Sequence, residues 1–305
     1  MNPVIASIII PTKNEEANIR RCLEAVCAQS VDFPFEVVVI DSGSRDRTVE
    51  VVGKFPARLL KIRPEEFHHA RTRNFGAAAS SGEYLVFLSA DAFPAGNGWL
   101  GALLRNFDGA GIAAVYGRQL PKPDATPERV FFMQHRYGTE RLVKNTTSNG
   151  AGKYQLFQFS NVNSAIRREV WQRTPFPEDI NAYEDFSFAI QVLRQGLSIV
   201  YEPDAAVYHS HNYTLLRSFQ QYFDSGVLYR RRQLWDAQQT NRLRSDGIRF
   251  IWNEVKYLLE QGTEHRVPYV LCYEAARYVG IILGRNERML PLAIKKKASS
   301  HRLFG

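Results

Sequence analysis

The sequence predicts an α/β protein in which a mixed, mostly parallel sheet is flanked by helices and followed by a helical C-terminal extension. Short apolar runs alternate with helical patterns between residues 6 and 92, which is the order that βαβ units require. Two of these runs end abruptly in a carboxylate, at Asp41 and Asp91. We therefore expect a catalytic or binding domain over residues 1–212 and a helical, basic extension over residues 213–305.

The composition is that of a folded globular protein, with 45% hydrophobic and 23% charged residues. The net charge of +8 indicates an anionic partner, for which nucleotide phosphates, nucleic acid and lipid headgroups are the candidates. The start of the chain shows no signal-peptide pattern, and no apolar stretch is long enough to span a bilayer. The three cysteines do not form a disulfide framework. These features predict a cytoplasmic protein.

The elements of the first part are predicted from their apolar patterns. Strands are expected where apolar residues run without interruption, as in strands buried on both faces. Helices are expected where apolar residues recur every three to four positions behind a capping residue. The predicted strands are 6–11, 36–41, 58–62 and the run that ends at 91, and the predicted helices are 19–27, 48–54 and 71–79.

The middle of the chain is less regular. Its patterns predict helices at 99–107 and 168–173, a helix that opens within 181–186 and runs to 195, and strands at 112–116, 198–201 and 206–208. Two segments are predicted to be loops, the Pro-rich 119–127 and the Gly-rich 145–153. The second is either a lid beside a site or an ordinary surface loop.

The C-terminal extension is expected to contain helices near 215–243, 248–260 and 268–283. Clusters of Arg and Lys are interleaved here with Tyr and Trp. The combination indicates either a face that contacts an anionic membrane or a solvated basic face above core aromatics. The same helices are candidates for acceptor binding or for a homo-oligomer contact. No nucleic-acid reader motif occurs, so a nucleic-acid partner is not expected.

A polar edge is expected where the strands end, because ligands of parallel sheets bind beyond the carboxyl ends of the strands. Asp91 lies there after the small residues Ser89 and Ala90, which let a ligand approach closely. Asp41 ends another strand of the same sheet. A single Asp in such a place is equally well explained by capping of the next turn. Two at one edge are harder to attribute to capping alone.

Further candidates lie at the ends of other predicted elements. They are the adjacent acids Glu184 and Asp185, the imidazoles of His209 and His211, and the arginines Arg71 and Arg73. A carboxylate and an imidazole can hold a hard divalent ion that binds phosphates, and arginines recognise phosphate oxygens. A second carboxylate is then available to take a proton from an attacking hydroxyl. The set predicts group transfer from a diphosphate-activated donor.

Three motifs carry a family resemblance. They are I-I-P-T-K-N-E at 9–15, V-I-D-S-G-S-R-D-R-T at 39–48, and R-N-F-G at 73–76 leading to G-E-Y-L-V-F-L-S-A-D-A at 82–92. Together with the Glu184–Asp185 pair they occur in the order typical of inverting nucleotide-sugar glycosyltransferases of family 2. The chain resembles that family over roughly its first two thirds, and the resemblance implies a GT-A fold.

The resemblance implies where the donor would bind. The residues expected around the nucleotide base are Pro11, Thr12, Glu15 and Asp41, with the Asp41 carboxylate at the edge of the pyrimidine ring. Arg71 and Arg73 would contact the diphosphate or the donor sugar.

The resemblance also implies a metal site and a base. Asp91, with Ser89 and Ala90 before it, matches the end of the family's Asp-x-Asp motif and would hold Mg²⁺ or Mn²⁺. His209 or His211 would be a further ligand. Asp185 would be the general base, with Glu184 beside it in a supporting or acceptor-binding role.

The sequence departs from the family pattern at two positions. Ser89 stands where the metal motif usually has its first Asp, and Ser42 replaces one Asp of the usual Asp-Asp-Gly-Ser. A single carboxylate holds a divalent ion less firmly than two carboxylates do.

F-H-H-A-R-T-R-N at 67–74 and H-S-H-N-Y-T at 209–214 are similar to a rhamnosyltransferase branch of the family. This implies a dTDP-β-L-rhamnose donor and a glycan or polyprenyl-linked acceptor in O-antigen-type polysaccharide synthesis, at the cytoplasmic face of the membrane. A UDP-hexose donor is the near alternative. The missing first Asp of the metal motif favours a second alternative, a catalytically silent nucleotide-sugar-binding module.

Overall fold

The computed structural model describes residues 4–109, 111–146, 156–179, 181–233, 237–301 and 303–304, without the side chains of 237–245. The chain divides into two compact units. The first consists of Met1–Lys122, Tyr137–Ala151 and Leu156–His209, and the second of Pro123–Arg136, Gly152–Gln155 and Ser210–Gly305. Pro123–Arg136 therefore groups with the C-terminal helices, although the sequence-based boundary places it in the first domain.

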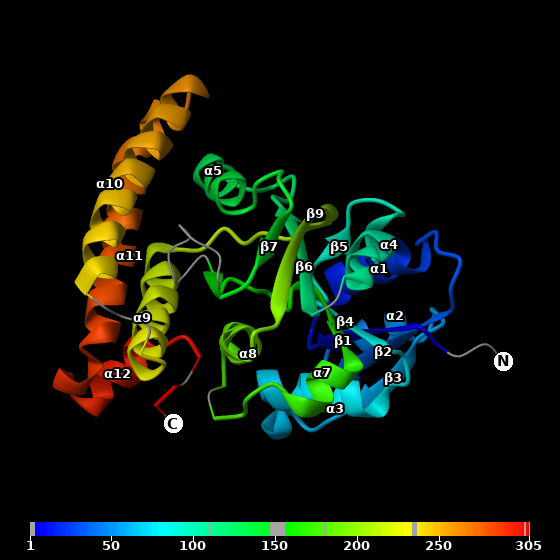
Figure 1. Ribbon diagram of the computed structural model, residues 1–305. Coiled ribbons are helices and arrows are strands. Elements are labelled where there is room, and N and C mark those ends of the chain that lie inside the picture. The colour runs from blue at the N-terminus through cyan, green and yellow to red at the C-terminus, as the bar shows by residue number, and fades with distance from the viewer. Residues whose placement is uncertain are drawn as a thin grey trace. The chain divides into compact units, whose positions relative to one another are not determined.

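A nine-stranded sheet forms the centre of the first unit, in the order β3-β2-β1-β4-β8-β6-β9-β5, with β7 paired to β9 (Figure 1). The strands are β1 (Ala6–Thr12), β2 (Phe35–Asp41), β3 (Arg58–Lys61), β4 (Tyr84–Leu88), β5 (Phe93–Pro94), β6 (Ile112–Leu120), β7 (Leu142–Lys144), β8 (Asn163–Arg167) and β9 (Ser198–Tyr208). The strands β3, β2, β1 and β4 are mutually parallel. This confirms the alternation predicted for the N-terminal part.

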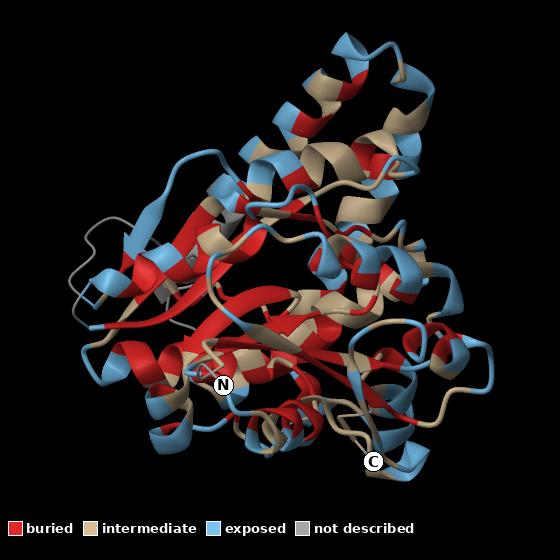
Figure 2. Cartoon of the chain, turned by 90° about the vertical axis from the view of Figure 1, so that its right-hand side faces the viewer, coloured by how far each residue is buried: buried red, intermediate tan, exposed pale blue. Residues whose placement is uncertain are grey.

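Helices cover this sheet. They are α1 (Glu16–Cys27), α2 (Thr48–Val52), α3 (His69–Ala79), α4 (Trp99–Leu104), α7 (Arg168–Arg173) and α8 (Glu184–Arg194), with 3₁₀ turns η1 (Pro64–Glu66) and η2 (Arg105–Asp108). Alternate residues of β1, Ile8 and Ile10, belong to one core cluster with Leu23 of α1 and with Trp99 and Leu103 of α4. Figure 2 shows that buried residues predominate along the central strands. Continuous apolar runs form these strands because both of their faces are covered.

Two parts of the sheet differ from the prediction. β8 was not expected, and it lies antiparallel between β4 and β6. The two short strands predicted at 198–201 and 206–208 are one strand, β9, whose pairing with β6 shifts register between Gly117 and Gln119. Pro203 lies in this irregular stretch and cannot donate to a strand ladder, which explains why the sequence suggested a break.

The second unit is helical in the part that the structure describes. Its helices are α5 (Pro127–Arg136), α9 (Leu215–Arg231), α10 (Ala237–Glu260), α11 (Val267–Arg285) and α12 (Leu292–Ala298), with 3₁₀ turns η3 (Glu264–Arg266) and η4 (Glu287–Met289). The predicted break between 243 and 248 is wrong, since α10 continues through Gly247. α9 and α11 approach so closely that a Cβ at Gly280 would lie 2.5 Å from the Phe219 carbonyl oxygen. Among the described helices, none is both long and apolar enough to cross a bilayer.

Substitution of Gly82 tests the close packing where the chain enters β4. An added Cβ would lie 2.6 Å from the backbone nitrogen of Ser7 and the backbone carbon of Ala6, neither of which can move without disturbing β1. We expect Gly82→Ala to lower the free energy of unfolding by about 1–3 kcal/mol, measured by urea denaturation. Gly96→Ala is the control, because its Cβ would meet nothing within 4 Å. Equal stability of the two variants would contradict this packing.

Candidate active site

The predicted site residues of the first strands lie at one edge of the sheet. Thr12 at the end of β1 is the register partner of Asp41 at the end of β2. Both are buried. The turn that begins at Ser89 follows β4, which pairs with β1 on the other side. The carboxyl ends of three parallel strands therefore meet here, which is where such sheets bind ligands.

Asp41 holds the turn that follows β2. Its carboxylate accepts hydrogen bonds from the backbone N–H groups of Gly43 at 3.1 Å and Ser44 at 3.2 Å. Asp41 therefore uses part of its hydrogen-bonding capacity to cap the turn, as the capping interpretation predicts. Beside it, the hydroxyl oxygens of Thr12 and Ser42 are buried and have no hydrogen-bond partner among the described residues. Buried hydroxyls are almost always paired, so these two favour a ligand at this edge.

The loop after β1 is tied to the loop after β2. Asn14 has a positive φ of 53°, a conformation that Asn tolerates better than most residues. Its backbone N–H donates to the Ser44 hydroxyl, and the N–H of Glu15 donates to the Thr48 hydroxyl, both at 2.8 Å. The Glu15 carboxylate accepts from Asn18 at 2.7 Å, within the first turn of α1. Pro11 is a strand residue of β1.

Asp91 is brought to His209 by strand pairing. Phe93 of β5 is the antiparallel partner of Tyr208 in β9, so the residues just outside this pair meet. The distance from Asp91 Oδ2 to His209 Nε2 is 3.5 Å, and the distance to Lys122 Nζ is 3.9 Å. Ser89 and Ala90 form the tight turn before Asp91, in which the Ala92 N–H donates to the Ser89 carbonyl at 2.9 Å.

Gln119 determines how the His209 ring is presented. His209 Nδ1 lies 2.9 Å from Gln119 Oε1, and Gln119 Nε2 donates to the Ser160 hydroxyl at 3.1 Å. The amide oxygen can only accept, so Nδ1 carries a proton, and Nε2 of the ring faces Asp91. When the ring is neutral, Nε2 is an acceptor atom. Two acceptor atoms 3.5 Å apart suit a cation between them. A carboxylate oxygen and an imidazole nitrogen are ligands that Mn²⁺ or Mg²⁺ accepts while keeping several waters, so these residues fit a divalent ion.

The adjacent acids at the start of α8 have different partners. Glu184 is buried and forms an ion pair with Arg73 of α3, with Nη1 2.9 Å from Oε1. Asp185 retains some exposure and accepts hydrogen bonds from the N–H groups of Asn161 at 3.2 Å and Phe186 at 2.7 Å. Asn161 also donates through its side chain to Glu184 at 3.3 Å. Asn161 therefore orients both acids.

These environments separate the acids electrostatically. For Glu184, burial disfavours the charge, but the positive charges of Arg73 and His69 outweigh burial and lower the pKa. For Asp185, burial and the negative charge of Glu184 raise the pKa to about 7. A carboxyl group that titrates near neutral pH is suited to accept a proton in a reaction. Tyr183, directly before the pair, has a positive φ of 61°, which is costly for a bulky residue and frequent at functional sites.

The remaining predicted residues are Arg71, Arg73, His211 and the loop 145–153. Arg71 is largely exposed and forms an ion pair with Glu178 at 3.3 Å, whereas Arg73 points into the protein toward Glu184. Their contact with a diphosphate stays a prediction. His211 belongs to the second unit, where its ring stacks on Tyr213 with centroids 5.3 Å apart. Most of the predicted lid, 147–153, lies outside the described residues.

The sequence interpretation missed Gln119, Lys122 and Asn161. Gln119 and Lys122 were assigned to a Pro-rich loop, and Asn161 was passed over in a polar run. Asn161 lies 23 positions or more from the acids it contacts, and Gln119 lies 90 positions from His209. The one signal available was the concentration of Asn and Ser at 160–164, a polar run that continues into β8.

A comparison of Arg71 and Arg73 tests the role of the buried ion pair. Arg73→Met should lower the free energy of unfolding by about 3–5 kcal/mol, because Glu184 would remain buried without its partner. Arg71→Met, on the same helix, should change it by at most about 1 kcal/mol, because the pair with Glu178 is exposed. Chemical denaturation of both variants measures the difference. Similar losses would contradict a structural role specific to Arg73.

Solved structures resemble this fold. The mannosyltransferase PcManGT from Pyrobaculum calidifontis, in complex with GDP-Man and Mn²⁺, superposes with a TM-score of 0.61 at 18% identity and covers 92% of this chain and 89% of its own. TarS 1–349 from S. aureus gives a TM-score of 0.57 at 18% identity over 94% and 91%. At this level of identity the likeness shows the fold alone, which is of the GT-A type.

Sequence relatives extend over nearly the whole chain. The O-antigen chain rhamnosyltransferase WbaN of Salmonella anatum is 33% identical over 98% of this chain and 95% of the relative. The O-antigen chain rhamnosyltransferase RfbN of Salmonella typhimurium is 31% identical over the same shares. Residues 7–174 match the family described as Glycosyl transferase family 2. This match over more than half of the chain, together with the 33% identity to WbaN, shows that the chain belongs to glycosyl transferase family 2.

Proposed function

We propose that this glycosyltransferase moves L-rhamnose from dTDP-β-L-rhamnose to a hydroxyl of a glycan or polyprenyl-linked acceptor in O-antigen synthesis, with inversion at the anomeric carbon. The observation that carries the chemistry is Asp185, whose carboxyl group lies beside Glu184 at the start of α8 and has its pKa raised to about 7. The donor and pathway are supported by the similarity to two O-antigen chain rhamnosyltransferases over 98% of this chain.

In the proposed reaction Asp185 accepts the proton of the acceptor hydroxyl. The hydroxyl oxygen forms a bond to the anomeric carbon, and the bond from that carbon to the diphosphate oxygen breaks. The electron pair of this bond leaves with the nucleoside diphosphate. Glu184 takes no proton in this scheme, because its ion pair with Arg73 keeps it ionised. Its charge instead raises the proton affinity of Asp185.

Asp91, His209 and His211 are the proposed ligands of Mg²⁺ or Mn²⁺. The use of a divalent metal in general fits the Asp91–His209 pair and a solved relative of this fold that was determined with Mn²⁺. When bound, the ion would stabilise negative charge on the departing diphosphate. Arg71 and Arg73 are the proposed protein contacts of that diphosphate, Arg71 through its exposed guanidinium and Arg73 while it remains paired with Glu184.

The nucleotide is proposed to occupy the edge formed by β1, β2 and β4. Thr12 and Asp41 would face the base, with Pro11 and Glu15 in the loop beside it. The unpaired hydroxyls of Thr12 and Ser42 support a ligand there. Ser89 and Ala90 would leave room for the ribose or phosphates, because their side chains are small.

Contact with an anionic membrane is proposed for η4 and α12 of the second unit. The apolar side chains of Met289, Leu292 and Ile294 are exposed. Lys296 and Lys297 are exposed on the same segment. Apolar side chains next to basic ones are typical of helices that lie in a membrane interface. A cytoplasmic location at the membrane face and a homo-oligomer through the C-terminal helices stay predictions.

The pH dependence of turnover tests the assignment of the base. The ionised form of Asp185 is active, so kcat should be full above pH 7 and fall as the pH drops through about 7. Asp185→Asn should lower kcat by about 10²- to 10⁴-fold while nucleotide binding is retained. Glu184→Gln removes the neighbouring negative charge and should lower the pKa of Asp185. The acid limb of the pH profile, where kcat falls with decreasing pH, should then move down by about one pH unit.

Asp204→Asn is the matched control for these variants, because its carboxylate is exposed and paired with Arg105. It should leave both kcat and the acid limb unchanged. An unshifted acid limb in Glu184→Gln would refute the coupling between the two acids. Loss of nucleotide binding in Asp185→Asn would refute the assignment of Asp185 as base alone.

Calorimetric titration with dTDP and with UDP, each with and without Mn²⁺, tests the donor and the metal. We expect tighter binding of dTDP than of UDP, strengthened by Mn²⁺. Asp91→Asn should abolish the Mn²⁺ effect and leave metal-free binding unchanged. Preference for UDP would replace the rhamnose donor by a UDP-hexose, and binding of neither nucleotide would contradict the proposed nucleotide-sugar donor.

A further inference from the structure

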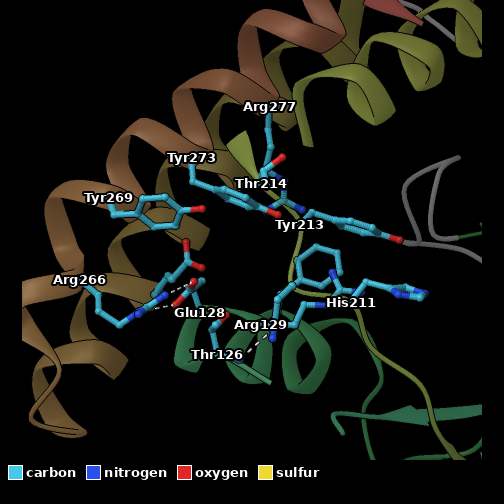
Figure 3. A pocket seen from close by; sticks show the side chains of 13 residues that line it. Thr126, Glu128, Arg129, His211, Tyr213, Thr214, Arg266, Tyr269, Tyr273 and Arg277 are labelled. Atoms are coloured by element: carbon cyan, nitrogen blue, oxygen red, sulfur yellow. Dashed lines mark hydrogen bonds and ion pairs between the residues drawn. The ribbon is translucent and has the colours of Figure 1, made fainter. Parts of the chain in front are cut away.

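Aromatic and charged side chains line a cavity of about 150 Å³ within the second unit. Its walls come from α5, the segment 211–214, α10, and the η3–α11 region. Figure 3 shows the rings of Tyr213, Tyr269 and Tyr273 around it, together with Glu128, Arg129, Arg266 and Arg277. Among the residues that line the cavity, only His211 has a role in the reaction proposed above.

The size of the cavity suits one six-membered ring. A cavity of about 150 Å³ lined only by apolar side chains accommodates benzene. Here the aromatic surface is accompanied by carboxyl and guanidinium groups, so a ring that carries several hydroxyl groups is a better match than an apolar one. Tyr269 and Tyr273 lie one turn apart on α11 with centroids 6.0 Å apart, and they form an apolar wall.

Glu254 provides an independent indication of a ligand. It is 1% exposed and lines the cavity from α10, and its Oε2 has no hydrogen-bond partner among the described residues. Burial and the charges of Glu274 and Glu128 raise its pKa to about 8, so at neutral pH it is a neutral carboxyl group that can donate a hydrogen bond as well as accept one. A buried, unpaired group of this kind needs a polar partner.

The charges around the cavity argue against an anionic ligand. Arg266 pairs with Glu128 through two hydrogen bonds, one of 2.9 Å and one of 2.6 Å. Arg277 pairs with Glu274 and lies over the rings of Tyr222 at 4.3 Å and Phe132 at 4.6 Å. Arg129 lies over the rings of Phe132 at 4.9 Å and Tyr213 at 5.6 Å. Each of the three guanidinium groups therefore has a carboxylate or an aromatic ring beside it, which favours a neutral polar ligand over an anion.

We propose that this cavity binds one neutral pyranose ring of the acceptor glycan. The inference rests on the proposed function, which requires a saccharide or saccharide-lipid acceptor. Tyr269 and Tyr273 would contact the apolar face of the ring, and Glu254 would bind its hydroxyl groups. His211 and Tyr213, which line the cavity, follow His209 by two and four residues in the sequence.

Saturation-transfer NMR of the full chain with methyl glycosides tests the proposal. The probes are methyl glycosides of galactose, mannose and rhamnose, with glucuronic acid and inorganic phosphate as anionic comparisons, all without nucleotide or metal. We expect at least one neutral glycoside to bind. Tyr269→Ala and Glu254→Leu should weaken that binding by about twofold to tenfold. Tyr278→Ala on α11 and Glu260→Leu on α10 are matched controls, since both residues lie outside the cavity and should have no effect.

The proposal is overturned if no neutral glycoside binds, if all four variants bind equally, or if phosphate or glucuronic acid binds more tightly than every neutral glycoside. Tyr269 is exposed, so its truncation should not unfold the unit. Nucleotide titration is independent of these measurements. Normal dTDP binding without glycoside binding would refute the cavity alone, and glycoside binding without dTDP binding would refute the proposed donor alone.

Discussion

The buried ion pair between Arg73 and Glu184 is the interaction on which the candidate active site depends. It joins α3 to α8 inside the first unit, with 2.9 Å between the charged atoms. Because Arg73 keeps Glu184 ionised, the adjacent Asp185 experiences a fixed negative charge and binds its proton more tightly. Two neighbouring carboxyl groups thereby acquire different protonation behaviour, which is how one helix start can supply both a structural anion and a base.

Much of this arrangement could be predicted from the sequence. The runs that form β1, β2 and β4 are apolar because helices cover both faces of the sheet, and parallel strands place Thr12, Asp41 and Asp91 at one edge. The chemistry of the adjacent acids was also accessible, since two acids in the first turn of a helix exceed what capping needs. The opposite pKa shifts of the two acids could not be predicted from the sequence, because they depend on Arg73, which lies more than a hundred residues away in the chain.

The strand β8 shows why the remainder was missed. Asn163 and Ser164 are fully buried in it, which an apolar pattern cannot reveal. Asn163 is satisfied by distant groups, accepting from the Trp99 indole at 2.8 Å and donating to the Ala205 carbonyl at 2.7 Å. In α10 the opposite error occurred, because a break was predicted between 243 and 248 where the helix continues. Gly247 lies in this stretch, and a single Gly costs only about 1 kcal/mol in a helix. A local sequence pattern reveals neither the hydrogen bonds that a buried polar residue makes with distant parts of the chain nor whether a helix continues through a residue of low helix propensity.

Asp91 and Asp185 lie in different environments, although both residues are partly exposed. The neighbours of Asp91 are an imidazole nitrogen held toward it by Gln119 and the ammonium group of Lys122, and both are compatible with an ionised carboxylate beside a cation. The neighbour of Asp185 is another carboxylate, which favours proton uptake. A metal ligand must stay ionised, whereas a base must bind and release a proton near neutral pH. The two environments therefore support the proposed roles, with Asp91 as a metal ligand and Asp185 as the base.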